Sequence, residues 1–132
     1  MSIKNCPCGR NKTYVDCCKK AHNNIESVKT AEDLMRSRYS AFVLANIDYL
    51  MLSWSSKTCN TSAKAKKELK EWTTSVTWVK LNVINSNDGQ EHHNTGTVEF
   101  KAFFYENGHL ECIQENSFFE RQNKHWVYVD KV

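Results

Sequence analysis

Apolar and polar residues follow each other with three different spacings, and each spacing belongs to a different stretch of the chain. The first 20 residues contain almost no large apolar side chains. From about residue 30 apolar residues recur at intervals of three and four, as on one face of a helix, and after Trp72 the interval changes to two. The sequence therefore predicts a small N-terminal arm, a helical region and an antiparallel sheet, in that order.

The helical region begins with a recognisable start signal. Thr30 is a favourable N-cap residue, and Asp33 follows at the third helical position. Asn46 is expected to close this helix. Apolar residues lie between these ends at helical spacing, with Arg38 and Tyr39 among them: Leu34, Met35, Phe42 and Ala45.

Two further helices are expected before the sheet. Asp48 can cap a short helix that ends at Trp54, and a longer helix is expected from Ser62 to Trp72. We interpret the lysines of the longer helix as a solvated face that two glutamates dilute, and a nucleic-acid surface is the weaker alternative. These lysines are Lys64, Lys66, Lys67 and Lys70.

The alternating region divides into four predicted strands around one strong turn signal. Asn107-Gly108 favours a two-residue hairpin, which would pair residue 106 with residue 109. In that register Phe100 lies opposite Glu115. A polar loop is expected at residues 86–94, and the strands are expected at 76–84, 97–105, 110–121 and 125–129.

The hairpin register sorts the strand residues onto two faces. If Asn123-Lys124 forms the next turn, Tyr128 and Asp130 join the face that packs on the helices. That face is predicted to carry Val98, Phe100, Ala102, Ile113, Glu115, Ser117 and Phe119. The opposite face is expected either to form a homodimer or to support the N-terminal arm, and it carries Phe103, Tyr105, Leu110, Cys112, Gln114 and Phe118.

Four of the six cysteines fall within the first 18 residues in the pattern C-x-C-x8-C-C: Cys6, Cys8, Cys17 and Cys18. Two cysteine pairs on two turns supply the four thiolates of a tetrahedral structural zinc site. Four protein ligands leave no position for a catalytic water, so the predicted role of the metal is structural. Iron also suits four sulfurs, and a pair of disulfides is the alternative without a metal.

Charge is distributed unevenly along the chain. Residues 1–20 carry five basic and one acidic side chain, or +4, within a total net charge of +3. Zinc with four thiolates adds about −2 and leaves the arm at about +2. This excess favours contact with an acidic surface or nucleic acid, and the alternative is that the lysines keep a small module soluble. With no apolar run that resembles a signal peptide or a membrane span, the expected compartment is the cytoplasm.

The cysteine segment resembles the SEC-C zinc motif, which is named after the C-terminal tail of the SecA translocation ATPase. That motif reads C-x-C-G-S-G-x-x-(Y/F)-x-x-C-(C/H), and Gly9 and Tyr14 agree with it together with the four cysteines. Arg10-Asn11 stands where the motif has Ser-Gly, so a contact made by the serine of the motif is in doubt. The resemblance implies a zinc-binding arm over residues 1–22.

The remainder of the chain resembles the YchJ family. The resemblance rests on the segment from Leu34 to Phe42, on Asp48-Tyr-Leu with Trp54, and on Glu115-Asn-Ser-Phe-Phe followed by His125-Trp-Val-Tyr-Val-Asp. In that family a SEC-C motif precedes one cone of the nuclear transport factor 2-like class. Residues 23–132 are therefore expected to form an α+β cone, with helices packed on a curved antiparallel sheet.

Membership of this family implies a fold and not a reaction. The first hypothesis is a non-enzymatic interaction protein whose zinc arm docks to a protein or ribosomal partner, as the SecA tail does. The second is a small-molecule or enzymatic pocket inside the cone, with Glu115 as a general base. Gln114 stands where the family commonly has histidine, which weakens an acid–base role. The candidate pocket residues are Arg38, Tyr39, Trp54, Trp78, Glu115 and Asp130.

A structural ion pair between Arg38 and Glu115, inside the helix–sheet interface, is the alternative to catalysis. Charged pairs at such sites more often stabilise architecture than react. We therefore assign no catalytic residue from the sequence, and enzymatic activity is left open.

Overall fold

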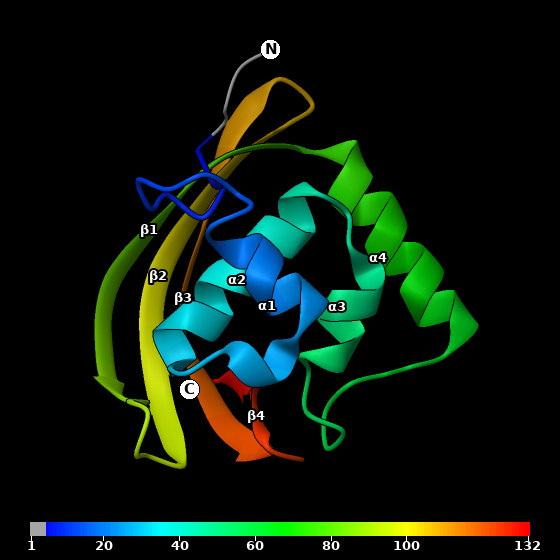
Figure 1. Cartoon of the computed structure of the whole chain (residues 1–132). Helices are drawn as coiled ribbons and strands as arrows, with labels where there is room; N and C mark the ends of the chain where they lie inside the picture. Colours follow the sequence, from blue (N-terminus) through cyan, green and yellow to red (C-terminus); the bar gives the residue numbers. More distant parts are fainter. Residues whose placement is uncertain (1–4) are drawn as a thin grey trace.

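The computed structural model describes residues 5–132, and its helices lie in the hollow of one curved sheet (Figure 1). The chain has the α+β cone architecture that the sequence predicts. Its elements are α1 (Cys18–Asn23), the 3-10 turn η1 (Ile25–Ser27), α2 (Ala31–Val43), α3 (Ile47–Leu52), α4 (Ala63–Ser75), β1 (Thr77–Asp88), β2 (Thr95–Glu106), β3 (His109–Gln122) and β4 (His125–Lys131).

Helix α2 begins as predicted and ends differently. The Thr30 side chain accepts a hydrogen bond from the Asp33 N–H at 3.1 Å, which confirms the N-cap. At the other end Ala45 has a φ of 54°, and the amides of Ala45 and Asn46 donate to the carbonyls of Phe42 and Ala41. This left-handed closure is a Schellman motif. The prediction that Asn46 closes α2 is therefore wrong.

Asn46 caps the next helix instead. Its side chain accepts from the Tyr49 N–H at 3.1 Å, so Asp48 is not the cap of α3. Helix α4 continues three residues past the predicted end at Trp72, to Ser75. The errors at α3 and α4 both concern helix ends, which are the least predictable part of a helix. At α3 the error arises because Asn46 lies between two neighbouring helices.

The sheet is antiparallel in the order β1-β2-β3-β4. The predicted hairpin is confirmed, because Glu106 pairs with His109 and Phe100 lies opposite Glu115. Asn107 and Gly108 both have positive φ, as a type I′ turn requires. Strand β1 extends to Asp88, so the loop that was predicted at residues 86–94 is shorter.

A bulge in β4 corrects the predicted inner face. Phe119 pairs with Tyr128, but Phe118 pairs with Asp130, so Val129 is an extra residue. Tyr128 therefore shares the face of Phe119, as predicted. Asp130 is exposed and lies beside the outward-facing Phe118, so the prediction that Asp130 joins the inner face is wrong.

The core lies between α2 and the inner face of the sheet. Its fully buried large side chains are Leu34, Leu50, Val98, Phe119, Val127 and Trp126. On the outer face Tyr105 and Leu110 are exposed, and a homodimer through this face stays a prediction. Among residues 5–132, no helix is long and apolar enough to cross a membrane.

Candidate metal centre and cavity

Helix α2 separates two candidate sites, because its side chains point in two directions. Arg36, Ser37 and Ser40 contact the N-terminal arm. Arg38 and Tyr39, with Met35 and Phe42, line a cavity between the helices and the sheet. Residues three and four apart share one face of a helix, so one helix serves both sites.

The four predicted cysteines converge on one point beside α2. Their sulfur atoms all lie within 4.8 Å of one another. A tetrahedral zinc with Zn–S bonds of about 2.3 Å has sulfur–sulfur edges of about 3.8 Å. The separation of 3.6 Å between Cys8 Sγ and Cys17 Sγ is close to that edge. The donor set and its geometry therefore fit a four-coordinate metal ion.

The local backbone gathers these ligands with a tight turn. The Gly9 amide donates to the Cys6 carbonyl at 3.2 Å, and Gly9 has a φ of 96°, a conformation that disfavours any residue with a Cβ. The second pair lies at the start of α1, with Cys17 at its N-cap. Cys6, Cys8 and Cys18 are buried, whereas Cys17 is partly exposed.

Burial and crowding make the four thiols electrostatically interdependent. Hydrogen bonds from Cys18 and Cys8 lower the pKa of Cys6. The hydrogen bond with Cys6, that with Cys8 and then burial raise the pKa of Cys18. One negative charge thus opposes the next, and a divalent cation would neutralise this repulsion. The Ser40 hydroxyl lies 3.5 Å from Cys6 Sγ, where it can donate to the thiolate.

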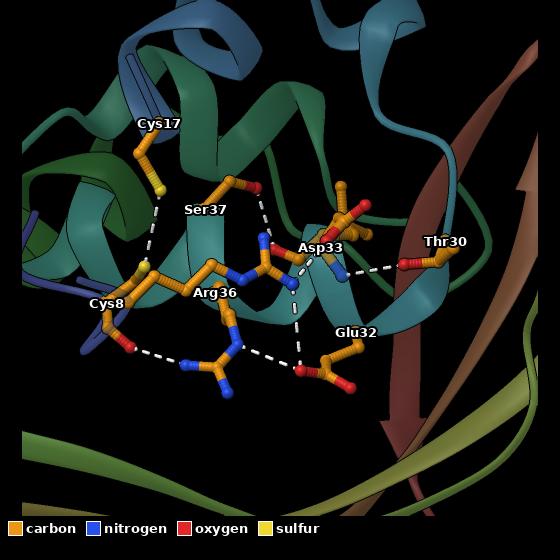
Figure 2. Close-up of polar contacts among 9 residues, drawn as sticks. Cys8, Cys17, Thr30, Glu32, Asp33, Arg36 and Ser37 are labelled. Atoms are coloured by element: carbon orange, nitrogen blue, oxygen red, sulfur yellow. Dashed lines mark hydrogen bonds and ion pairs between the residues drawn. The ribbon is translucent and has the colours of Figure 1, made fainter. Parts of the chain in front are cut away.

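Two arginines fasten the arm to the first turns of α2 (Figure 2). Arg36 donates to the Cys8 carbonyl at 2.7 Å and to Glu32 at 3.0 Å, and Figure 2 shows it between these two residues. Arg10 lies 2.5 Å from Asp33 and 3.7 Å from Glu32. The residue that departs from the SEC-C pattern therefore makes an ion pair to the cone.

A second link joins the arm to α2 through a histidine. His22 Nε2 lies 2.8 Å from the Ser37 carbonyl, so this nitrogen carries the hydrogen. His22 Nδ1 then accepts from the Tyr14 hydroxyl at 2.6 Å. Burial lowers the pKa of His22. Helix α1 contains the predicted boundary between residues 22 and 23, so the arm runs into the cone without a free linker.

The second site is a cavity of about 200 Å³ inside the cone. Five of the six candidate pocket residues line it: Arg38, Tyr39, Trp54, Trp78 and Glu115. Asp130 does not, because of the β4 bulge. The remaining lining residues are mostly apolar: Met35, Phe42, Trp72, Phe100, Ala102, Ile113, Ser117 and Tyr128.

Arg38 is held in this cavity by neutral groups. The side chain is buried, and Nη1 donates to the Leu50 carbonyl at 3.0 Å and to the Ser53 hydroxyl at 2.8 Å. Its guanidinium carbon lies 4.9 Å from the centre of the Tyr128 ring and 5.3 Å from that of Trp54. Burial lowers the pKa of Arg38 to about 10, so the group stays charged at neutral pH.

The expected ion pair between Arg38 and Glu115 is not formed within 4.0 Å. Glu115 Oε2 instead accepts from the Ser117 hydroxyl at 2.5 Å and from the Tyr128 hydroxyl at 3.0 Å. Burial, followed by the nearby Glu115 charge, raises the pKa of Tyr128, so this hydroxyl stays protonated and donates. Trp54 Nε1 is buried and finds no acceptor among the described residues.

Sequence reasoning missed the contacts that join the arm to α2. The ion pair of Arg10 and the bond from Arg36 to a backbone carbonyl depend on three-dimensional approach, which no spacing reveals. Trp72 also lines the cavity, and the sequence did carry a signal for it. An aromatic residue near the end of a lysine-rich helix indicates a buried contact. In the structure it packs edge-to-face on Trp78 with ring centres 5.3 Å apart.

Comparison with known proteins identifies the family of the chain. Residues 30–131 match the family model described as "YchJ, middle NTF2-like domain". A UPF0225 protein of Vibrio parahaemolyticus is 45% identical over 127 residues, which cover 95% of this chain and 72% of that protein. A UPF0225 protein of Streptomyces coelicolor is 40% identical over 130 residues, which cover 98% of this chain and 96% of the relative.

Two solved structures share the whole architecture. The solution structure of a SEC-C motif containing protein from Rhodopseudomonas palustris has a TM-score of 0.85 at 29% identity and covers 98% of both chains. The crystal structure of a SEC-C motif containing protein from Psychrobacter arcticus has a TM-score of 0.79 at 28% identity, covering 98% of this chain and 82% of the other. The chain with its buried cysteine cluster and its helix-filled sheet therefore belongs to the YchJ family.

Proposed function

We propose that this protein is a non-catalytic binding protein, whose arm is shaped by one structural zinc ion and docks to a protein or ribosomal partner. The observation that carries the proposal is the convergence of four cysteine sulfurs within 4.8 Å. With all four positions taken by protein, the metal has no open site for a substrate or a reactive water. Its effect is then to fix the shape of the surface around it.

Zinc is the commonest ion in structural sites with four cysteine ligands, and the same donor set also suits iron. Elemental analysis of protein purified without added metal tests the identity of the bound metal ion. We expect one zinc per chain. One iron per chain, with the charge-transfer colour of iron–thiolate bonds, would contradict zinc and leave the structural role in place.

The outer surface of the arm supports docking. A groove of about 240 Å³ lies beside the metal ligand Cys17, and Lys12, Asp16 and Lys20 are among the residues that line it. Arg10 is engaged with Asp33, so the positive charge that faces outward comes from Lys12, Lys19 and Lys20. The exposed Val15 adds an apolar contact of the kind that interface centres use.

Co-sedimentation with purified ribosomes tests this docking. We expect the metal-loaded protein to sediment with ribosomes, and the triple variant K12E/K19E/K20E to lose that association. A matched control, K64E/K66E/K67E on α4, makes the same change of charge on exposed lysines away from the arm. We expect the control to sediment like the wild type.

Equal loss in both triple variants would mean unspecific attraction to RNA, and it would contradict docking through the arm. Sedimentation unchanged in the arm variant would contradict it too. Chelation of the metal should abolish the association in the same assay, because the groove is built on the cluster.

A further inference from the structure

Arg38 carries a buried charge that no carboxylate of the described residues contacts directly. The residue is 4% exposed, and all of its hydrogen bonds go to a carbonyl and a hydroxyl. Within the described part of the chain, no carboxylate lies within 4.0 Å of its nitrogens. Buried charges are normally paired, because removing them from water is costly. The cavity that Arg38 lines is therefore where an anionic partner fits.

An unsatisfied hydrogen-bond donor lies in the same wall as Arg38. Trp54 Nε1 is buried without an acceptor, and its ring lies 5.3 Å from the Arg38 guanidinium carbon. An indole N–H that is buried usually finds a partner. One group with two acceptor oxygens, such as a carboxylate, can satisfy Trp54 and Arg38 together.

Glu115 restricts which anions can enter. Its Oε2 is occupied by the Ser117 and Tyr128 hydroxyls, whereas Oε1 makes no hydrogen bond to any residue in the range 5–132. An anion that merely approaches Glu115 would be repelled. A ligand that also carries a hydroxyl or an amine can donate to Oε1 and turn this repulsion into a bond.

The rest of the cavity lining is apolar and aromatic, and it favours a ligand that carries an aromatic ring. Phe42, Trp72 and Trp78 stack edge-to-face or tilted, with ring centres between 5.3 and 6.1 Å apart. Phe100, Ala102 and Ile113 form the floor on the sheet. A cavity of about 200 Å³ holds a ligand of roughly ten non-hydrogen atoms at the packing density of protein interiors. That is one six-membered ring with a short polar tail.

We propose that the cone binds small aromatic carboxylic acids that carry a hydroxyl or amine on the carbon next to the carboxylate. The carboxylate accepts from Arg38 and Trp54, and the neighbouring hydroxyl or amine donates to Glu115. The ring packs against Trp78 and Phe42. This site is separate from the docking surface of the arm, because it lies on the opposite side of α2.

Calorimetric titration of the metal-loaded protein with three matched compounds tests the ligand class. Mandelate has the ring, the carboxylate and the hydroxyl; mandelamide lacks the negative charge; phenylacetate lacks the hydroxyl. We expect mandelate to bind about tenfold or more tightly than either of the others, since each loses one charge-assisted hydrogen bond.

Two variants assign the binding to the named residues. R38M should weaken mandelate about tenfold or more and leave mandelamide nearly unchanged. E115Q should tighten phenylacetate and reduce the preference for mandelate, because it removes the repelling charge. Lys80→Met, on the exposed outer side of β1, should match the wild type in all three titrations.

Retained metal and a cooperative thermal transition show that R38M is folded, and R38K, which keeps a charge, should recover part of the affinity. Equal affinity for mandelate and mandelamide would overturn the proposal. So would unchanged mandelate binding in R38M, or no binding of mandelate at millimolar concentration.

Discussion

Arg36 and Arg38 stand two residues apart on α2, and their surroundings differ in one respect. Arg36 reaches a carboxylate, Glu32, at 3.0 Å and the Cys8 carbonyl at 2.7 Å. Arg38 is more deeply buried and reaches only neutral groups. On the arm side the protein supplies both partners of each interaction. On the cavity side the protein supplies the Arg38 guanidinium but no carboxylate in contact with it, and a cavity lies beside the group.

We interpret this difference as one between a region that stabilises the fold, beside the cysteine cluster, and a region that binds a ligand, in the cavity. The polar groups beside the cysteine cluster satisfy one another's hydrogen bonds. The Tyr14 hydroxyl donates to His22, and His22 donates to the Ser37 carbonyl. In the cavity, Trp54 Nε1 has no acceptor among the described residues, and Arg38 donates only to neutral groups. A complete network stabilises one conformation, whereas we expect an incomplete network beside a cavity to bind a ligand.

Loss of one metal ligand should have the largest effect. The arm has too few apolar side chains to fold alone, so Cys17→Ser should abolish stoichiometric metal binding and cost several kcal/mol of unfolding free energy. Metal analysis and urea unfolding measure the two effects. Cys112→Ser, on the exposed outer side of β3, is the matched control and should change neither. A C17S variant that keeps its metal and its stability would show that the cluster is not the centre of the arm.

Replacing each arginine of the pair breaks the comparison directly. R36M removes a paired group and should lower the free energy of unfolding by about 2 kcal/mol, through lost charge-assisted hydrogen bonds. R38M removes a buried unpaired charge, so its loss of hydrogen bonds is offset, and the change should stay within about 1 kcal/mol. Urea unfolding of the wild type and of both variants measures these two changes in the free energy of unfolding. A larger loss in R38M than in R36M would mean that Arg38 is architectural.

The histidine link should make the arm sensitive to acid. His22 is partly buried and its pKa is lowered, so the unfolded chain binds a proton more readily than the folded one. Its contribution to stability is therefore fully present above about pH 6.5, and it declines as the pH falls below that value. H22Q should reduce this decline by about 1 kcal/mol between about pH 7.5 and pH 5.5.

Unfolding curves at the two pH values, with bound metal measured at each, separate this effect from acid release of the metal. An identical decline in the wild type and in H22Q would exclude His22 as its source.

The smallest effect is expected at the end of α2, away from both sites. Ala45 has a φ of 54°, where glycine is favoured, so A45G should stabilise the protein by about 0.5–1 kcal/mol. Metal content and ligand affinity should not change. Thermal unfolding measures the gain, and a loss of stability would show that the left-handed turn is not strained.

The sequence was a good guide where local chemistry decides the structure. Asn107-Gly108 determined the register of the central hairpin, and this register placed Phe100 opposite Glu115. Thr30 marked the start of α2. In these cases a turn or a cap is specified by adjacent residues alone.

It failed where packing of distant segments decides. The bulge at Val129 turns Asp130 outward, and nothing in the alternation of β4 signals the extra residue. The expected pair of Arg38 and Glu115 placed both residues in one cavity correctly but not in contact. Arg10 was taken as a departure from a motif, and only the approach of Asp33 gives it a partner.

One measurement tests the contrast between the completed arm and the incomplete cavity. Amide and indole signals of the metal-loaded, nitrogen-labelled protein are followed by NMR as mandelate is added. We expect the signal of the Trp54 indole N–H to shift as this group gains an acceptor. The amides of Tyr14 and His22, and the indole of Trp126, which already donates to the Lys29 carbonyl at 3.0 Å, should stay in place. An unmoved Trp54 signal, or a shift confined to the arm, would contradict it.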